Sequence, residues 1–358
     1  MGEQPAGLDR LVVMSSLRAV RPTTNPYVVE LNERLARRVT VELFSWRRFL
    51  LGRWDVLHVH WPEVLVRRRT PSRTWLAATL LRLGLLRARG GRRVVVRTVH
   101  NLEPHEGQAP AVRRALDAVD RATRGWVVLN GHTPPPGPGP VAVIPHGTYT
   151  QWYAGAPEPA AVPGRIAYVG LVRPYKGVDD LVRAFRSTAD DALTLHVCGR
   201  PQDEAAADAL RALAGDDPRI HLDLRHLPDA DLAREVRQAE LVVLPYRAMH
   251  NSGAALLALS LGRPVLVPRN PVTDDLAAEV GAAWVQRLEG ALDGGALVDA
   301  WSRARGLTGA PDLGARDWDE IADAHVRFFA SLVGRQDEAG ASVGVPGAAT
   351  GSGADRRR

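Results

Sequence analysis

Short apolar runs alternate with amphipathic stretches along most of this 358-residue chain. Runs such as "RRVVVRTVHN" (92–101) and "AELVVLPY" (239–246) are rich in valine and leucine, which predicts buried strands. Between such runs, apolar residues recur at helical spacing, as in "AVRRALDAVDRAT" (111–123). Alternation of strand and helix is typical of parallel sheets that are covered by helices on both faces.

The predicted elements form two series. In the first series, strands are expected at 11–16, 39–45, 55–61, 92–101, 125–131 and 141–147, and helices at 25–38, 72–89 and 111–123. In the second series, strands are expected at 165–170, 193–199, 219–224, 239–246 and 263–268, and helices at 177–188, 203–215, 228–238 and 251–262.

A stretch rich in Pro, Gly and Ala, "YTQWYAGAPEPAAVPG" (149–164), separates the two series and predicts a linker. We therefore predict an α/β protein with two Rossmann-like, doubly wound domains. Ligands of such sheets bind at the carboxyl ends of strands, where helices begin. The expected boundaries are a first domain at 1–150, a linker at 151–164, a second domain at 165–316, a last helix at 317–334 and a disordered Gly/Ala/Ser/Arg tail at 335–358.

Composition narrows the class of protein. The first apolar run, "LVVM", is too short for a secretory signal. No stretch reaches the ~18 uncharged apolar residues that a membrane span needs. The single cysteine, Cys198, excludes an intramolecular disulfide and a cysteine metal site. These features indicate a cytosolic protein.

Charge is divided unevenly along the chain. Residues 1–150 hold 23 Arg and 11 Asp and Glu, a formal charge of +12, whereas the remainder holds 23 Arg and Lys and 29 Asp and Glu, a formal charge of −6. A basic first half is compatible with nucleic acid, with an anionic membrane surface, or with arginines that are simply solvated.

Lys176 is the only lysine among 46 Lys and Arg residues. It lies in "RIAYVGLVRPYKGVDDLVRAF" (165–185), in a predicted turn between a strand and a helix, three residues after Arg173. Two cations and unpaired backbone amides at a helix N-terminus suit a diphosphate. An ammonium is a compact point charge, so this position favours a phosphate oxygen in a space that a guanidinium would not fit.

A second motif, "VVLPYRAMHNSGAALLALSLGRPVLVP" (242–268), places a strand end at Tyr246 and opens a helix with Asn251, Ser252 and Gly253. Asn and Ser are good N-caps. Small residues in the first turn leave backbone amides open to an anion, and the helix dipole adds about 1–2 kcal/mol in a favourable site.

Together, the two motifs resemble the nucleotide-sugar-dependent glycosyltransferases of the GT-B fold, in which two Rossmann-like domains face a central cleft. The resemblance covers roughly residues 10–333, and "LHVCGRP" and "VIPHGTY" are also similar to their counterparts there. It implies a metal-independent transfer from a nucleotide diphosphate sugar, with GDP-mannose as the expected donor and no further cofactor. It also implies a last helix that crosses back, and donor-binding roles for Arg173, Lys176, Gly199, Arg200, Tyr246, Asn251, Ser252 and Gly253.

The chain departs from glycosyltransferase family 4 at three positions. Family 4 usually carries two glutamates eight positions apart around the second motif, where this chain has Met249 and Leu257. The arginine that usually follows the first glycine of the lysine motif is Leu171, and we expect Arg173 to replace it. With these differences, and with the stretches "HVHWPE" and "TVHNLEPHE", the chain resembles the branch that includes bacterial exopolysaccharide β-mannosyltransferases.

The stretch "VRTVHNLEPHEGQ" (96–108) follows a strand of the first domain, and the resemblance places it across the cleft from the donor. Transfer to a hydroxyl needs a base, or groups that stabilise the sugar in the transition state. We expect His100 to be catalytic or to orient the sugar, Glu106 to be the first candidate base, and Glu103 the second.

Residues 58–63, "HVHWPE", end another strand of the same sheet. We expect His60, Trp61 and Glu63 to bind the acceptor, with Trp61 stacking on a sugar and Glu63 binding a hydroxyl. The resemblance implies a glycan or polyprenyl-diphosphate-linked acceptor.

The apolar helix at 72–89 runs into an arginine cluster, and "RRFLLGRW" and "RRR" lie nearby in the sequence. Such a surface suits peripheral docking on the anionic inner face of the cell membrane, whereas an internal helix is the alternative. No nucleic-acid partner is expected.

Two other functions stay open at this point. The histidines His58, His60, His100 and His146 would suit a metal-dependent hydrolase, although two separate series argue against the barrel that such an enzyme needs. The missing glutamate pair would suit a non-catalytic glycan-binding relative.

Overall fold

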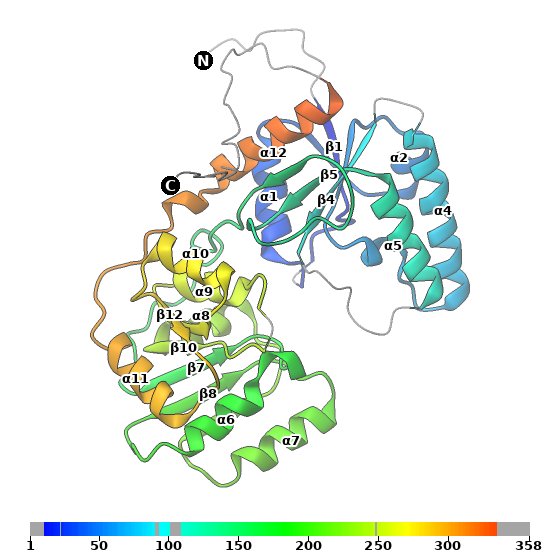
Figure 1. The fold of residues 1–358 in the computed structure, drawn as a ribbon. Coiled ribbons are helices and arrows are strands. Elements are labelled where there is room, and N and C mark those ends of the chain that lie inside the picture. The colour runs from blue at the N-terminus through cyan, green and yellow to red at the C-terminus, as the bar shows by residue number, and fades with distance from the viewer. Residues whose placement is uncertain (1–10, 22, 90–92, 101–108, 248, 335–358) are drawn as a thin grey trace, which may run out of the picture.

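The computed structural model describes residues 11–21, 23–89, 93–100, 109–247 and 249–334. Within them lie two parallel sheets, each in a separate lobe (Figure 1). The predicted arrangement of strands and covering helices is therefore present in both lobes.

The first lobe contains a sheet of six described strands in the order β2-β1-β3-β4-β5-β6. One face packs on α1 and α12, and the other packs on α3, α4 and α5, with a separate apolar core on each face. The strands are β1 (Val12–Ser15), β2 (Thr40–Leu43), β3 (Val56–Val59), β4 (Val94–Val99), β5 (Thr123–Val128) and β6 (Val141–Val143). The helices are α1 (Pro26–Ala36), α2 (Trp46–Leu51), α3 (Pro62–Val66), α4 (Pro71–Arg89) and α5 (Pro110–Ala122).

The second lobe repeats the design in the order β12-β11-β10-β7-β8-β9, around one large apolar core. Its strands are β7 (Arg165–Val169), β8 (Thr194–Cys198), β9 (Ile220–Asp223), β10 (Leu241–Val243), β11 (Val265–Pro268) and β12 (Val285–Leu288). Its helices are the 3₁₀ turn η1 (Pro174–Lys176), α6 (Val178–Arg186), α7 (Glu204–Ala214), α8 (Asp229–Gln238), α9 (Gly253–Ser260), α10 (Pro271–Val280), α11 (Gly294–Ala304) and the 3₁₀ turn η2 (Gly314–Arg316).

The sequence prediction omitted α10, β12 and α11 of the second lobe, as well as α2 and α3 of the first. β12 pairs only with β11 and is an edge strand that includes Gln286 and Arg287, so its apolar signal is weak. The start of α10 does carry a signal, because Asn270 and Thr273 form a capping box with a proline at the first turn.

The last helix, α12 (Trp318–Val333), follows the second lobe in sequence but packs against α1 of the first lobe (Figure 1). Trp318, Ile321 and Phe329 are buried in the core that α1 shares with the sheet. At the surface, Arg38 pairs with Asp319 at 3.0 Å and also with Asp323. The helix therefore fastens the two lobes together, in agreement with the crossing that the resemblance implied.

The segment between the sheets has turns but no regular element, as expected of a linker. It is not free, because Tyr149 and Tyr153 are buried in the core of the second lobe. Two contacts tie its start to the region where α12 begins: the Trp318 indole donates to the Thr148 carbonyl at 2.7 Å, and the Arg316 guanidinium donates to the His146 carbonyl at 3.1 Å. The predicted tail at 335–358 lies outside the described residues.

Candidate active site between the two lobes

Lys176 lies in the η1 turn, between the carboxyl end of β7 and the start of α6. The following residue, Gly177, has a φ of 63°, and a Cβ there would lie 2.2 Å from the Pro245 carbonyl oxygen. A glycine is needed both for the backbone conformation and for this close approach. The turn is thereby pressed against the strand end of the second motif.

The ammonium of Lys176 is half-buried and donates a 2.8 Å hydrogen bond to the Tyr246 hydroxyl. It also lies 4.3 Å from the centroid of the Tyr246 ring. Burial lowers the Lys176 pKa; the Tyr175 phenol raises it and the Arg173 charge lowers it further. No carboxylate of the described residues pairs with this ammonium, so it is a cation with unused capacity for an anion.

The second motif meets the lysine turn through Tyr246. Burial raises the pKa of this tyrosine to about 12, while the nearby Ser252 side chain lowers it. Ser252 caps α9, and its hydroxyl accepts a 3.1 Å hydrogen bond from the Ala255 amide. Tyr246 therefore lies close to both Lys176 and the N-cap of α9.

Gly199 and Gly170 directly follow the neighbouring strands β8 and β7, and their backbones approach closely. A Cβ on Gly199, whose φ is 149°, would lie 1.8 Å from the Gly170 carbonyl oxygen. Beside them, the Arg173 guanidinium donates to the Val172 carbonyl at 2.7 Å and to the Arg200 carbonyl at 3.3 Å. Among the described residues, neither Arg173 nor Arg200 pairs with a carboxylate. Cationic side chains thus gather at this sheet edge.

Sequence reasoning did not identify Arg247, which holds the lysine turn in place. Its guanidinium binds Asp179 and Asp180 in the first turn of α6 at 2.7–3.0 Å, and the Pro174 carbonyl at 2.6 Å. Its backbone amide donates to the Tyr175 carbonyl at 2.8 Å. Two acidic residues at a helix start are unfavourable for an anion site, and the Arg247 charge offsets them. The signal in the sequence that could have indicated a balancing cation is the acidic pair itself, which lies directly after the predicted phosphate site.

The first lobe reaches this region through His100 and Asn130. The Asn251 amide donates to the His100 carbonyl at 3.2 Å, and the Asn130 amide donates to the Asn251 side-chain oxygen at 2.9 Å. Asn251 therefore connects the start of the helix in the second motif with the carboxyl ends of β4 and β5. The structure brings the predicted histidine to the same interface as the second motif.

The His100 ring is held on three sides. The Trp61 ring stacks on it at 4.3 Å between centroids and 18° between planes, and the Tyr27 ring meets it edge-on at 5.1 Å. His60 Nδ1 lies 3.1 Å from His100 Nε2. Burial lowers the pKa of His60 and of His100 well below the ordinary value, so both imidazoles are neutral near pH 7.

The residues expected to bind the acceptor occupy different environments. Trp61 and Glu63 are half-buried at the start of α3, whereas His60 is only 2% exposed and lies behind His100. The candidate bases Glu103 and Glu106 lie outside the described residues, so their roles stay predictions.

At the positions where family 4 usually has glutamates, Met249 and Leu257 are buried in the apolar core of the second lobe. Neither position offers a charge to the site. The departure noted in the sequence is therefore accommodated by packing.

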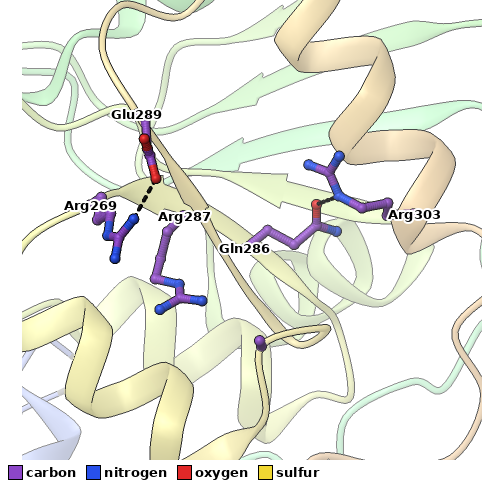
Figure 2. A pocket seen from close by; sticks show the side chains of 6 residues that line it. Arg269, Gln286, Arg287, Glu289 and Arg303 are labelled. Atoms are coloured by element: carbon purple, nitrogen blue, oxygen red, sulfur yellow. Dashed lines mark hydrogen bonds and ion pairs between the residues drawn. The ribbon is translucent and has the colours of Figure 1, made fainter.

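A recess of about 240 Å³ opens elsewhere on the second lobe, beside β12 (Figure 2). Its arginines are already engaged: Arg269 pairs with Glu289, Arg287 binds Asp274 at 2.7 Å, and Arg303 donates to the Gln286 amide oxygen at 3.0 Å. No predicted site residue lines it. Among the described residues, no group of three or more His, Cys, Asp or Glu could hold a metal ion, so the hydrolase alternative gains no support.

Helix α4 carries an apolar face that the core does not cover. Trp75, Leu76, Leu83 and Leu86 are 63%, 53%, 54% and 57% exposed. Arg82 and Arg87 are exposed on the same helix. Among the helices that the structure describes, none is long and apolar enough to cross a membrane.

Comparison with known proteins places these features in context. A family model described as "Glycosyl transferases group 1" matches residues 163–288, which include the lysine turn and the second motif. The chain is 38% identical over 336 residues to a GDP-mannose:glycolipid 4-beta-D-mannosyltransferase of Xanthomonas campestris pv. campestris. The matched region covers 93% of this chain and 96% of that relative.

Solved structures agree in fold. AviGT4, a glycosyltransferase involved in avilamycin A biosynthesis, matches with a TM-score of 0.56 at 15% identity and covers 91% of this chain and 98% of its own. Anabaena HepE in complex with UDP matches with a TM-score of 0.61 at 13% identity, covering 90% of this chain and 100% of its own. The predicted GT-B fold, with two Rossmann-like domains, is confirmed.

Proposed function

This chain belongs to the group 1 glycosyl transferases, and we propose that it transfers mannose from GDP-mannose to a glycan or polyprenyl-diphosphate-linked saccharide. The observation that carries the proposal is the similarity over 336 residues to an enzyme named for that donor and for a glycolipid acceptor. That similarity spans both lobes, so it includes the surroundings of Lys176 as well as those of His100.

The donor diphosphate would lie between the Lys176 ammonium and the N-terminus of α9. Support comes from an ammonium that pairs with no carboxylate of the described residues, from Tyr246 beside both that ammonium and Ser252, and from the small Gly253 that opens the helix. Arg173 and Arg200 would add positive charge from the neighbouring strand ends. These groups supply the charge that a metal ion would otherwise provide, so we propose a metal-independent transfer that needs no further cofactor.

Transfer breaks the bond between the anomeric carbon and the diphosphate and forms a bond to an acceptor oxygen. The acceptor hydroxyl loses its proton in this step, so a base within hydrogen-bond reach is expected. We propose Glu106, or else Glu103, as that base. His100 would bind the sugar or the acceptor at the interface of the lobes, beside Trp61 and Glu63.

A lipid-linked acceptor places the reaction at a membrane, and we propose that the exposed face of α4 docks there. Its apolar side chains would enter the boundary of an anionic leaflet, while Arg82 and Arg87 contact the headgroups. The basic first half of the chain agrees with this orientation. The enzyme would then be a peripheral protein on the inner face of the cell membrane.

A transfer assay tests the proposed function. Purified protein would receive radiolabelled GDP-mannose or UDP-glucose, a polyprenyl-diphosphate-linked saccharide, and either EDTA or a divalent metal. We expect transfer of label to the lipid fraction with GDP-mannose as donor and not with UDP-glucose. The rate of transfer should be the same with and without EDTA. Transfer from UDP-glucose alone would contradict the donor, and loss of transfer in EDTA would contradict metal independence.

A further inference from the structure

His60 and His100 follow the neighbouring parallel strands β3 and β4, and their rings form a hydrogen bond at the carboxyl edge of the sheet. The bond joins His60 Nδ1 to His100 Nε2 at 3.1 Å. Because burial keeps both rings neutral, one nitrogen must donate its proton and the other must accept it. The direction of this bond decides which chemistry the other nitrogen of His100 can perform.

The surroundings of His60 favour one direction. His60 Nε2 is buried and has no hydrogen-bond partner among the described residues. If His60 accepted through Nδ1, its proton would lie on Nε2, as a buried donor without an acceptor. If His60 donates through Nδ1, Nε2 carries only a lone pair. Orphaned buried donors are rarer in proteins than acceptors with unused capacity, so donation by His60 has the lower cost.

Neighbouring His325, on α12, shows the same pattern independently. Its Nδ1 contacts the Ile321 carbonyl at 2.8 Å, and a carbonyl only accepts, so the proton of His325 lies on Nδ1. Its Nε2 is then a buried lone pair without a described partner, as we infer for His60.

We propose that His60 is a positioning residue whose Nδ1–H donates to His100 Nε2 and thereby fixes the tautomer of His100. The proton of His100 then lies on Nδ1, which makes no hydrogen bond to a described residue. Stacking by Trp61 and the edge of Tyr27 fix the plane of the ring. His100 therefore offers a hydrogen-bond donor to its ligand.

This inference rests on the proposed function and makes it more specific. A His100 that presents Nδ1–H can bind a sugar hydroxyl or a phosphate oxygen, but it cannot take the proton of the acceptor hydroxyl. The base must then be another group, such as Glu106. His60, which the sequence suggested as an acceptor contact, acts through His100.

The tautomer can be measured in the resting enzyme, without any substrate. Protein labelled with ¹⁵N-histidine would be studied by NMR near pH 7, with His100→Gln and His60→Asn used to assign the two rings. We expect His100 to be protonated at Nδ1 and bare at Nε2. Protonation of His100 at Nε2, or at both nitrogens, would overturn the proposal.

Two substitutions at His60 provide a second readout. In His60→Asn the amide can still donate to His100 Nε2, whereas in His60→Asp the carboxylate can only accept and forces the other tautomer. We expect transfer within roughly 10-fold of wild type for His60→Asn and a loss of about 100-fold or more for His60→Asp, on the scale of a misplaced catalytic proton. Equal activity of the two variants would refute the positioning role.

A matched control is His58→Asn, which alters a buried histidine of the same cluster that binds Thr98 at 2.8 Å and does not contact His100 through a hydrogen bond. The rate of transfer by His58→Asn shows how much activity is lost when any buried histidine of this core is replaced by a smaller polar residue. If wild-type protein showed no transfer with any donor, the proposed function would fail, while the NMR result would still decide the tautomer.

Discussion

The ammonium of Lys176 donates a hydrogen bond to the hydroxyl of Tyr246, a residue 70 positions later in the chain. This bond joins the turn before α6 to the strand end before α9. Two helix starts and one cation are thereby placed at the same edge of the second sheet. The proposed binding of a diphosphate depends on this arrangement.

Tyr246→Phe should weaken binding of GDP without preventing folding. The ring is retained, but the hydroxyl that accepts the hydrogen bond of the Lys176 ammonium is lost. We expect a loss of about 0.5–1.5 kcal/mol in binding free energy, the usual contribution of one hydrogen bond. Isothermal titration calorimetry with GDP measures it, and an affinity above that of wild type would show that the hydroxyl does not position the ammonium.

Glu106→Gln should abolish transfer and spare donor binding. The amide has nearly the shape of the carboxylate but cannot accept the acceptor proton, so the rate should fall by roughly 10²–10⁴. The measurement pairs the transfer assay with GDP calorimetry. Glu103→Gln is the comparison, because it alters the second candidate. Substantial turnover of Glu106→Gln together with loss in Glu103→Gln would transfer the role to Glu103.

Replacing Trp75, Leu83 and Leu86 with serine should release the enzyme from membranes. More than half of each side chain is exposed and none belongs to the core cluster of this face, so the fold should be retained. Sedimentation with vesicles of anionic or neutral phospholipid is the measurement, and we expect binding of wild type to anionic vesicles only. Val143→Ser is the control, because Val143 is 58% exposed on β6, away from α4. Unchanged sedimentation of the triple variant would contradict the assignment of this face.

Acidification below pH 6.5 should destabilise the first lobe. Burial lowers the pKa of histidines in and beside its core, to about 4 for His146 and His325, and well below the ordinary value for His58, His60 and His100. The unfolded chain binds protons near pH 6.5 while the folded chain does not, so stability rises with pH between about 4 and 6.5 and is lost as pH falls. Each histidine adds roughly 1.4 kcal/mol per pH unit to this slope.

Thermal denaturation followed by tryptophan fluorescence, between pH 7 and pH 5, measures the effect. The control is His325→Gln, which removes one titrating group on α12 and should make the dependence on pH shallower. A midpoint that stays constant down to pH 5 would mean that these histidines are not buried in the neutral form.

Periodicity predicted both sheets because Val-rich runs at strand positions are buried on two faces. It missed β12, where an edge strand needs few apolar residues, and α10, whose capping box at Asn270 and Thr273 was overlooked. The motif around Lys176 was informative because a lone lysine in an arginine-rich chain is itself a chemical signal.

Other parts of the site could not be read from the sequence. The Arg247 guanidinium binds Asp179 and Asp180, which lie nearly 70 positions earlier in the chain, and no local pattern predicts such a contact. The bond between His60 and His100 depends on the order of β3 and β4 in the sheet. Burial of His60 likewise depends on a residue distant in sequence, because its ring packs edge-on against Tyr27 of α1 at 5.6 Å between centroids.

The most direct test of the account is calorimetric titration of GDP into wild type, Lys176→Ala and Lys176→Arg. The control is Arg211→Ala, which removes an exposed cation from α7. We expect Lys176→Ala to weaken binding by about 2–5 kcal/mol, the range for truncation of one partner of a buried charge pair. The affinity of Lys176→Arg for GDP should lie between those of wild type and Lys176→Ala, and the affinity of Arg211→Ala should match that of wild type. An unchanged affinity of Lys176→Ala for GDP would contradict the proposed diphosphate site.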